Sequence, residues 1–429
     1  MISIKKIVKA LVPSKTVLAN LGNLNDSYLF ITAPIRHWNA LRKLRKKTKI
    51  KVAFFVLHSS IWKCDELYKK MEKDEKFEPI VIICPYMSFG EDIMHKEMNV
   101  AYNFFFQKNY KVLKTYNSDT GNWLDVKNEI NPDIVFFTNP HEITRKEYYI
   151  RNYLDNLTCY VPYTFQVSNL YMLQYNRIFH NLLWKAFYQT PIHKKIAIKY
   201  ARNKGRNVVI SGYPGIDVFA DKSYLPFDKW KIKDRNIKRI IWAPHHTFGD
   251  DSLSYSNFIK YHQVMLDIAE KYSGKIQMAF KPHPILRPKL GLENGWGEEK
   301  TNEYYLKWNS ISNGQIEESD YVDLFLTSDA MIHDSASFLA EYLAVNKPVL
   351  FMVRDKKITE RLNEFGIIAL EQHYMAHSED DIYDFIENIV INGNDPKRNQ
   401  REAFYKNYLI SPGNISATNN IFNEIVREL

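Results

Sequence analysis

The sequence predicts a two-domain α/β protein in which two Rossmann-like domains face a cleft, preceded by a basic helical arm. At 429 residues the chain is long for one hydrophobic core, so two domains are expected. Short apolar runs alternate with helical patterns in both halves, which is typical of βαβ units and parallel sheets. A charged stretch at 222–236, interrupted by Pro226, separates the two sets and is the expected linker.

These patterns divide the chain into an arm over 1–49, an N-terminal domain over 50–225 and a C-terminal domain over 226–429. A helix-rich stretch is expected at 175–201. The expected strands are 50–57, 77–84, 133–138, 159–165 and 207–210 in the first half, and 239–244, 276–280, 330–332, 349–353 and 367–370 in the second. In parallel sheets of this kind, ligands bind beyond the carboxyl ends of the strands.

The basic charge is concentrated in the arm. The chain carries a net charge of +9, and residues 1–51 alone hold nine Lys and three Arg against one Asp, so the remainder is slightly acidic. An apolar helical stripe near the N-terminus lies beside cations, and a second helix is expected at 34–45. The cations expected at a membrane are Lys5, Lys6, Lys9, Arg42, Lys43, Arg45, Lys46 and Lys47.

Such an arm suits an anionic surface. We expect a peripheral protein on the cytoplasmic face of the cell membrane; a solvated basic segment without a partner is the alternative. A nucleic-acid-binding protein with a basic arm is a further alternative, but the sequence has no recognisable RNA- or DNA-binding motif, so no nucleic acid partner is expected.

The cysteines and the hydropathy exclude other classes. Cys64, Cys84 and Cys159 are widely spaced and form no C-x-x-C pair, which argues against a disulfide framework and a structural zinc site. The sequence contains no run of about 18 consecutive apolar residues, so no transmembrane helix is predicted. Residues 1–19 lack the apolar centre and cleavage site of a signal peptide.

The strongest chemical signals follow strands of the second half. Lys281 and His283 lie on a loop that Pro282 and Pro284 make rigid, and both side chains can donate hydrogen bonds to a diphosphate. His245 and His246 follow another strand; phosphate or base contacts are expected of them, with a structural role as the alternative. No third metal ligand is evident near this pair in the sequence, so no metal site is predicted.

A strand, a hydroxylated turn and a helix are expected around 330–343. Ser335 and Ser337 would offer hydroxyl and N–H groups to a phosphate at the helix N-terminus, where Asp334 or Ser335 would also serve as an N-cap. Glu341, further along the helix, is expected either to reach a ribose diol or to be exposed. Gly212 lies in a glycine-bounded loop after a strand, at the presumed cleft.

The order and spacing of six motifs resemble the CDP-glycerol glycerophosphotransferase family of teichoic-acid and capsule polymerases. The similarity covers roughly residues 205–355. The motifs are Gly-x-Pro-x-x-Asp (Gly212, Pro214, Asp217), Ala-Pro (Ala243, Pro244), Lys-Pro-His-Pro (281–284), Ser-Asp-x-x-Asp-Leu (319–324), Ser-Asp-Ala-x-Ile-x-Asp-Ser-x-Ser (328–337) and Lys-Pro (Lys347, Pro348).

This resemblance implies a GT-B fold, and transfer of glycerol phosphate or a related polyol phosphate from a CDP-linked donor to a lipid-linked or polymer acceptor, with no cofactor. It places His283 at the family's Lys-x-His-Pro histidine and Asp334, Ser335 and Ser337 at its Asp-x-Ser-Ser turn. The family's His-Gly-Thr-type segment, which supplies a proposed base, has no histidine here at 161–166. His58, after the first strand, is the substitute considered.

A second hypothesis keeps the fold and changes the donor. Glu341 and the Lys347–Pro348 pair are also similar to sugar-nucleotide glycosyltransferases and UDP-GlcNAc 2-epimerases. A glycosyltransferase of capsule or lipopolysaccharide synthesis that uses a CMP-, UDP- or GDP-sugar is therefore the alternative. The epimerase is less favoured, because a soluble epimerase has no need of a basic arm.

Overall fold

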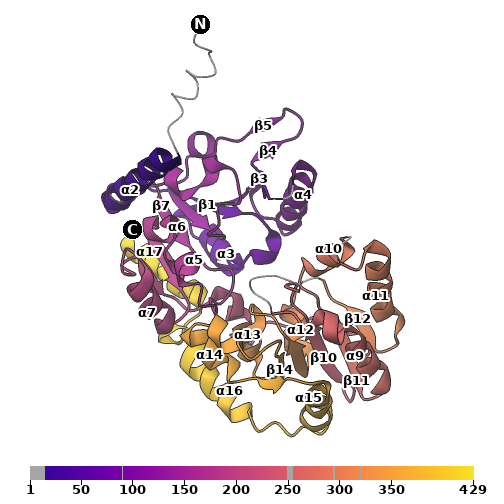
Figure 1. Ribbon diagram of the computed structural model, residues 1–429. Coiled ribbons are helices and arrows are strands. Elements are labelled where there is room, and N and C mark those ends of the chain that lie inside the picture. Colours follow the sequence, from indigo (N-terminus) through magenta and orange to yellow (C-terminus); the bar gives the residue numbers. More distant parts are fainter. Residues whose placement is uncertain (1–14, 89, 249–254, 293–294, 319) are drawn as a thin grey trace.

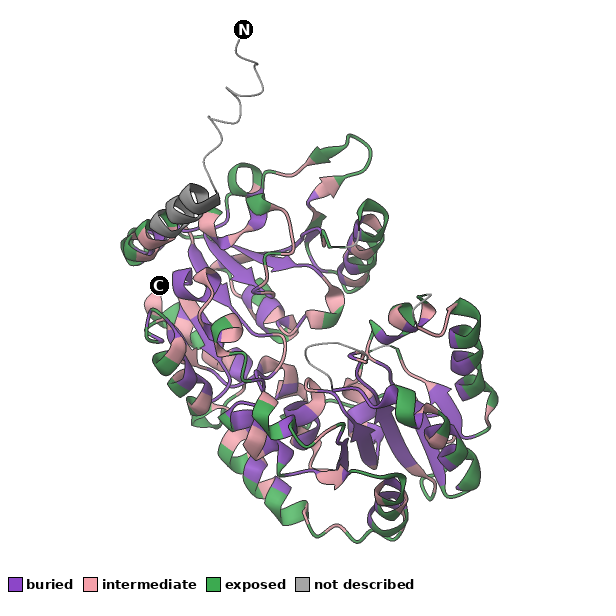
Figure 2. Cartoon of the chain, in the orientation of Figure 1, coloured by how far each residue is buried: buried purple, intermediate pink, exposed green. Residues whose placement is uncertain are grey.

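The computed structural model describes residues 15–88, 90–248, 255–292, 295–318 and 320–429, with side chains described from residue 25 onward. It contains two α/β lobes, each built on a parallel sheet with helices around it (Figure 1). The sheets are buried and the outer helix faces are exposed (Figure 2). The expected α/β class with two Rossmann-like sheets is confirmed.

The first sheet has the strand order β3-β2-β1-β6-β7-β8-β9, and all of its neighbouring strands are parallel. Its central strands are covered on both faces, which explains their nearly continuous apolar sequences. The strands are β1 (Ile50–Val56), β2 (Phe77–Ile83), β3 (Val112–Lys114), β6 (Ile134–Phe137), β7 (Leu157–Tyr160), β8 (Lys185–Tyr188) and β9 (Val208–Ile210); a hairpin of β4 (Tyr116–Asn117) and β5 (Asn122–Trp123) stands apart.

The second sheet has the order β12-β11-β10-β13-β14-β15 and is also parallel. Its strands are β10 (Lys238–Ala243), β11 (Ile276–Phe280), β12 (Gly314–Ile316), β13 (Ala330–His333), β14 (Val349–Met352) and β15 (Tyr374–Ala376). Because β10 lies between β11 and β13, the loops that leave these three strands meet at one edge of the sheet.

Helices surround both sheets. Those of the first lobe are α2 (Lys15–Leu44), α3 (Asp65–Lys73), α4 (Glu91–Gln107), α5 (Tyr171–Tyr175), α6 (Ile178–Leu182), α7 (Pro191–Tyr200) and α8 (Asp217–Ala220). Those that follow are α9 (Phe258–Lys271), α10 (Leu286–Gly291), α11 (Glu298–Ser310), α12 (Val322–Thr327), α13 (Phe338–Glu341), α14 (Glu364–Leu370), α15 (Glu379–Asp384), α16 (Arg398–Phe404) and α17 (Ala417–Glu428). None of the described helices is both long and apolar enough to cross a bilayer.

One local prediction was wrong, and two others were incomplete. The run at 367–370 is not a strand but the end of α14, which the Asn363 side chain caps by accepting the Gly366 N–H. Short apolar runs do not distinguish a buried strand from a buried helix. The stretch at 175–201, expected to be helix-rich, also contains β8, and the strand expected at 159–165 begins at Leu157 and ends at Tyr160.

The arm expected over 1–49 is not a detached unit. Residues 1–14, with Lys5, Lys6 and Lys9, lie outside the described residues. Instead of a helix restricted to 34–45, one helix runs from Lys15 to Leu44 with Pro34 inside it. One of its faces is buried against the first lobe through Leu29, Ala33, His37, Ala40, Leu41 and Leu44.

The last helix, α17, packs on the first lobe. The C-terminal domain expected over 226–429 therefore does not include this helix. Ile421, Phe422 and Ile425 belong to the same apolar cluster as β1 and β2. The Phe422 ring lies 5.7 Å from that of Phe77. Lys185 of β8 pairs with Glu424 and with Glu428.

The Gly212–Asp217 motif holds this returning segment in place. The Asp217 carboxylate accepts the backbone N–H groups of Ala417 and Thr418, both at 2.8 Å, at the start of α17. Gly212 has φ +87°, and a Cβ there would lie 2.0 Å from the Ser411 hydroxyl oxygen. Gly212 was expected to contact a donor. Instead it lies against Ser411 and Ala417 of the segment that leads back into α17, which we call the C-terminal crossover. Only glycine allows so close an approach.

Gly212→Ala should therefore destabilise the protein by about 2–5 kcal/mol, because the added Cβ meets both an unfavourable φ and a steric clash. Gly274 is the matched control, with φ +85° and nothing within 4 Å of an added Cβ. Gly274→Ala should cost only the backbone strain, about 1–2 kcal/mol. Urea unfolding measures both values, and equal losses would contradict the crossover role of Gly212.

Candidate functional site

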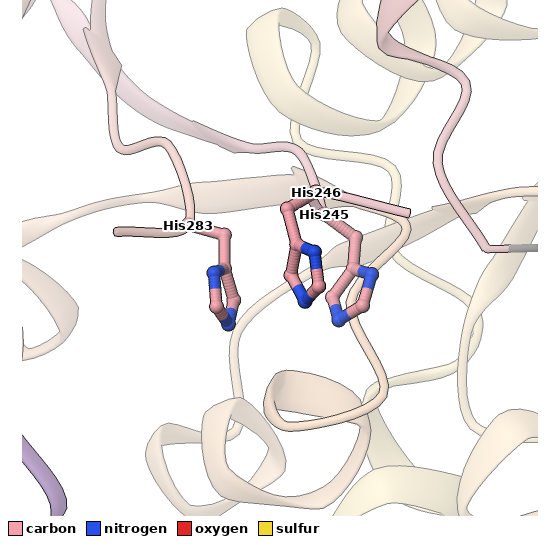
Figure 3. Close-up of side chains that lie close together, drawn as sticks. All are labelled: His245, His246 and His283. Carbon is pink, nitrogen blue, oxygen red and sulfur yellow. The ribbon is translucent and has the colours of Figure 1, made fainter. Parts of the chain in front are cut away.

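Three histidines meet at the carboxyl ends of β10 and β11. His245 and His246 follow β10, and His283 follows β11 (Figure 3). Their ring centroids are 4.4 Å apart for His245 and His246, 4.3 Å for His246 and His283, and 5.1 Å for His245 and His283. We call this group the histidine cluster. One ring nitrogen from each histidine lies within 4.8 Å of those of the other two, so by distance alone the cluster could hold a metal ion.

Backbone hydrogen bonds keep the two loops in register. The His283 N–H donates to the Pro244 carbonyl at 3.1 Å, and the Lys281 N–H donates to the Trp242 carbonyl at 2.8 Å. The His245 N–H donates to the Asp334 carboxylate at 2.6 Å. The cluster is thus placed by main-chain contacts among the three adjacent strands.

The hydrogen bonds at Nδ1 determine what the cluster can bind. Nδ1 of His245 accepts the Thr247 N–H at 3.3 Å and lies 2.8 Å from the Thr247 hydroxyl. Nδ1 of His283 accepts the Ile285 N–H at 3.2 Å. In a neutral imidazole the proton must then be on Nε2, so both rings present an Nε2–H donor. A metal at these Nε2 atoms would require protons on both Nδ1 atoms and would break the bonds that they accept.

Burial keeps both imidazoles neutral. Burial, with a smaller contribution from the charge of His246, lowers the pKa of His245 to about 2 and that of His283 to about 3. Neutral imidazoles with fixed N–H groups are hydrogen-bond donors to an anion, and they need no reorganisation when charge develops on it. The donor set therefore fits a phosphate oxygen better than a cation.

Lysines supply the positive charge beside the cluster. Lys281 at the end of β11 is buried, and its Nζ lies 3.4 Å from the Glu317 carbonyl oxygen. Burial lowers its pKa to about 8, while Asp320 and Glu317 oppose this shift. Lys289 on α10 was not identified from the sequence; its Nζ lies 3.4 Å from the His246 carbonyl oxygen, and its charge contributes to the lowered pKa of His283.

Asp334 positions this loop. It is 1% exposed, and its carboxylate accepts the N–H groups of His245 and Asn257, which join the β10 loop to the start of α9. Burial raises its pKa to about 7. The donor contact expected of Asp334 is replaced by this internal role, because both carboxylate oxygens already accept backbone groups.

The serine turn differs from the expected phosphate-binding helix N-terminus. The Ser335 N–H donates to Nδ1 of His333, and α13 has only four residues before it continues as a 3₁₀ turn. So short a helix carries little of the dipole that was expected to attract a phosphate. Ser337 is the N-cap residue, and its side chain makes no capping bond.

Glu341 is neither exposed nor accessible to a ribose in this conformation. Its carboxylate is 2% exposed and accepts hydroxyl groups from Tyr213, at 3.0 Å, and from Tyr321. Lys63, which precedes α3 in the first lobe, donates to the Tyr321 hydroxyl at 2.9 Å. Burial raises the Glu341 pKa. The residue therefore joins the two lobes through a polar network that the linear sequence did not reveal.

His58 follows β1, at the carboxyl end of the first sheet. Its Nδ1 lies 3.1 Å from a carboxylate oxygen of Glu97 on α4, and its ring packs edge-on against Tyr86. This carboxylate–imidazole pair orients the ring and directs Nε2 away from Glu97, which suits a general base. Glu97 lies 39 residues from His58, and no sequence pattern linked the two.

The basic residues at the end of α2 divide into two groups. Arg45 donates to the Glu428 carbonyl oxygen, and Lys47 pairs with Asp133 at 2.6 Å, so both hold the fold together. Arg42, Lys43 and Lys46 are exposed.

Comparisons with known proteins place this geometry in a class. Residues 184–426, more than half of the chain, match the family described as CDP-glycerol:poly(glycerophosphate) glycerophosphotransferase. The teichoic acid ribitol-phosphate polymerase TarL of Staphylococcus aureus is 25% identical over a match of 161 residues, and the match covers 35% of this chain and only 26% of TarL.

Two solved structures show the same fold at low identity. The wall teichoic acid polymerase TagF, as its H444N variant, superposes with a TM-score of 0.58 and 12% identity over 95% of this chain and 98% of that chain. The S. aureus MnaA–UDP structure has a TM-score of 0.56 and 16% identity, over 89% and 98% of the two chains.

The fold of the two lobes is GT-B-like. The chain belongs to the CDP-glycerol:poly(glycerophosphate) glycerophosphotransferase family. The resemblance stated from the six motifs is therefore confirmed.

Proposed function

We propose that the protein transfers glycerol phosphate, or a related polyol phosphate, from a CDP-linked donor to a lipid-linked or polymer acceptor at the cytoplasmic face of the membrane. The observation that carries this proposal is the pair of fixed Nε2–H donors of His245 and His283 beside Lys281, within the region that matches the family. A structure of TagF soaked with CDPG is among its fold neighbours. No cofactor or metal takes part in the proposed reaction.

In this reaction the acceptor hydroxyl oxygen attacks the β-phosphorus of the donor and forms a new O–P bond. The bond between the β-phosphorus and the bridging oxygen breaks, and CMP leaves with the electron pair. His245, His283 and Lys281 donate hydrogen bonds to the diphosphate oxygens, where negative charge accumulates. The hydroxyls of Ser335 and Ser337 are additional candidate donors. Nε2 of His58, oriented by Glu97, takes the proton of the acceptor hydroxyl.

A sugar nucleotide is the second candidate donor, and the likeness to the UDP-bound MnaA structure supports it. Calorimetric titration with CDP, UDP and GDP, followed by turnover assays with CDP-glycerol and with CMP-, UDP- and GDP-sugars, separates the two. Tight binding of CDP and release of CMP from CDP-glycerol are expected. Turnover of a sugar nucleotide with none of CDP-glycerol would establish the alternative.

Affinity for the donor diphosphate should fall as the pH rises through about 8, the pKa of Lys281. Burial depresses this pKa, so the cation is present below that pH and is lost above it. Lys281→Arg keeps the charge and should bind CDP with little change between pH 7 and 9. Asp334, with a pKa of about 7, titrates in the unaltered protein and in Lys281→Arg alike, so it does not contribute to the difference between their pH profiles. Calorimetry measures the difference, and parallel pH profiles would exclude Lys281 as the titrating group.

A further inference from the structure

Helix α2 has a second apolar face. Among the described residues, the side chains of this face belong to no buried apolar cluster. Its inner face is buried against the first lobe, whereas Tyr28, Ile31, Ile35 and Trp38 point outward. Their exposed fractions are 62%, 67%, 60% and 56%. We call these four residues the outer stripe. In Figure 1, α2 lies at the margin of the first lobe, away from the second.

The spacing of the outer stripe is that of one helix face. Steps of three, four and three residues place the side chains in a row along the helix. Other large exposed apolar side chains lie on separate elements, such as Phe106 on α4, Met172 on α5 and Leu306 on α11. Single exposed side chains are ordinary on a protein surface, but a continuous row indicates a surface that binds something apolar.

Cations border this row at its C-terminal end. The Arg42 guanidinium lies 4.6 Å from the centre of the Trp38 ring, one further helical step along the same face. Lys43 and Lys46 are exposed beside it. Asp26, the one acidic residue in the sequence of α2, is paired with Arg151 at 2.9 Å. The outer stripe is therefore an apolar and aromatic row that is bordered by exposed cations.

We propose that the outer stripe inserts into the interfacial layer of an anionic lipid bilayer, with α2 parallel to the membrane plane and Arg42, Lys43 and Lys46 among the headgroups. Aromatic side chains favour the interface because one end is apolar and the other is polar, and basic residues add attraction to anionic lipids. This inference rests on the proposed membrane-associated acceptor and assigns its docking surface. Binding through the outer stripe differs from binding through residues 1–14 alone. Because α2 packs on the first lobe, its insertion would fix the orientation of that lobe relative to the membrane.

Co-sedimentation with vesicles of phosphatidylcholine and phosphatidylglycerol tests the proposal. Ile31→Ser, Ile35→Ser and Trp38→Ser, combined in the full chain, should lower the partition coefficient by about tenfold or more and abolish binding at high salt. The matched control combines Phe106→Ser, Met172→Ser and Leu306→Ser, and it should bind as the unaltered protein does. A chain without residues 2–14 should retain part of its binding through the outer stripe.

Neutralising Arg42, Lys43 and Lys46 to Gln should weaken the salt-sensitive part of binding, because electrostatic attraction fades within a Debye length. The same change at Lys73, Lys222 and Lys356, which are exposed elsewhere, is the control. Unchanged vesicle binding by the stripe variant would overturn the proposal. So would conversion of a dimer to a monomer by the stripe variant in sedimentation, since the stripe would then contact a second copy.

Release of CMP from CDP-glycerol with a short soluble acceptor keeps the two proposals apart. The stripe variant should retain this activity, because the stripe lies outside the histidine cluster. Loss of vesicle binding together with intact CMP release supports both proposals. No CMP release by the unaltered protein, together with stripe-dependent vesicle binding, would reject the proposed reaction and leave the docking surface standing.

Discussion

Replacing His283 with alanine lowers the rate of CMP release from CDP-glycerol by about 10²–10³ while the fold persists, because one preorganised donor to the developing charge is lost. His283 lies at the carboxyl end of β11, and its Nδ1 accepts the Ile285 N–H, so the neutral ring carries its proton on Nε2 and can donate it. Initial rates at saturating donor measure the loss. Because the donor acts on charge that increases in the transition state, kcat should fall more than donor affinity.

His377→Ala is the matched control, since this histidine is exposed after β15 and outside the cluster. It should leave the rate unchanged. His283→Gln keeps an N–H group on a side chain of similar reach and should restore part of the rate lost in His283→Ala. Near-normal turnover by His283→Ala would show that the residue only shapes the turn.

Replacing His58 with alanine removes the proposed general base and lowers kcat by about 10²–10⁴ without changing the affinity for CDP. The affinity is unaffected because His58 lies on the first lobe, whereas the histidine cluster lies on the second. Added imidazole should restore part of the rate, because it can take up the acceptor proton in the space left by the side chain. Rescue of this kind would not follow if His58 only stabilised the fold.

Glu97 is a positioning residue in this scheme, and its variants should form a graded series. Glu97→Gln retains an oxygen that can accept the His58 Nδ1–H bond and should lose less activity than Glu97→Ala, which leaves the imidazole free to rotate. Both should keep the wild-type affinity for CDP. Equal activity in all three proteins would remove Glu97 from the mechanism and leave the choice of base open.

The linear pattern was sufficient wherever a property depends on neighbours in sequence. The apolar runs of β1, β10 and β11 predicted buried parallel strands, because a strand covered on both faces is apolar along most of its length. The loop from Lys281 to His283 was likewise recognisable, since two prolines and the end of a strand fix its place. The order of the six motifs then indicated the family.

The prediction of secondary structure failed where a short apolar run fits a buried helix as well as a buried strand. The run at 367–370 is apolar enough for either, and the Asn363 cap and its packing selected a helix. For α2 the sequence predicted a helix only over 34–45, and it could not show that one apolar face packs on the first lobe while the outer stripe remains exposed. Which face is covered depends on residues far along the chain, such as those of β1 and α17.

By itself the sequence determined the α/β class, most of the strands, the family and the loops that carry Lys281, His283 and Ser335. Only the tertiary structure decided what those groups do. It set the tautomers of His245 and His283 through backbone donors, paired His58 with Glu97, buried Glu341 between Tyr213 and Tyr321, and committed Gly212 to the C-terminal crossover. The physical reason is that a hydrogen bond, a desolvated charge or a steric clash depends on atoms brought together by folding, and residues far apart in sequence leave no periodic signal of their pairing.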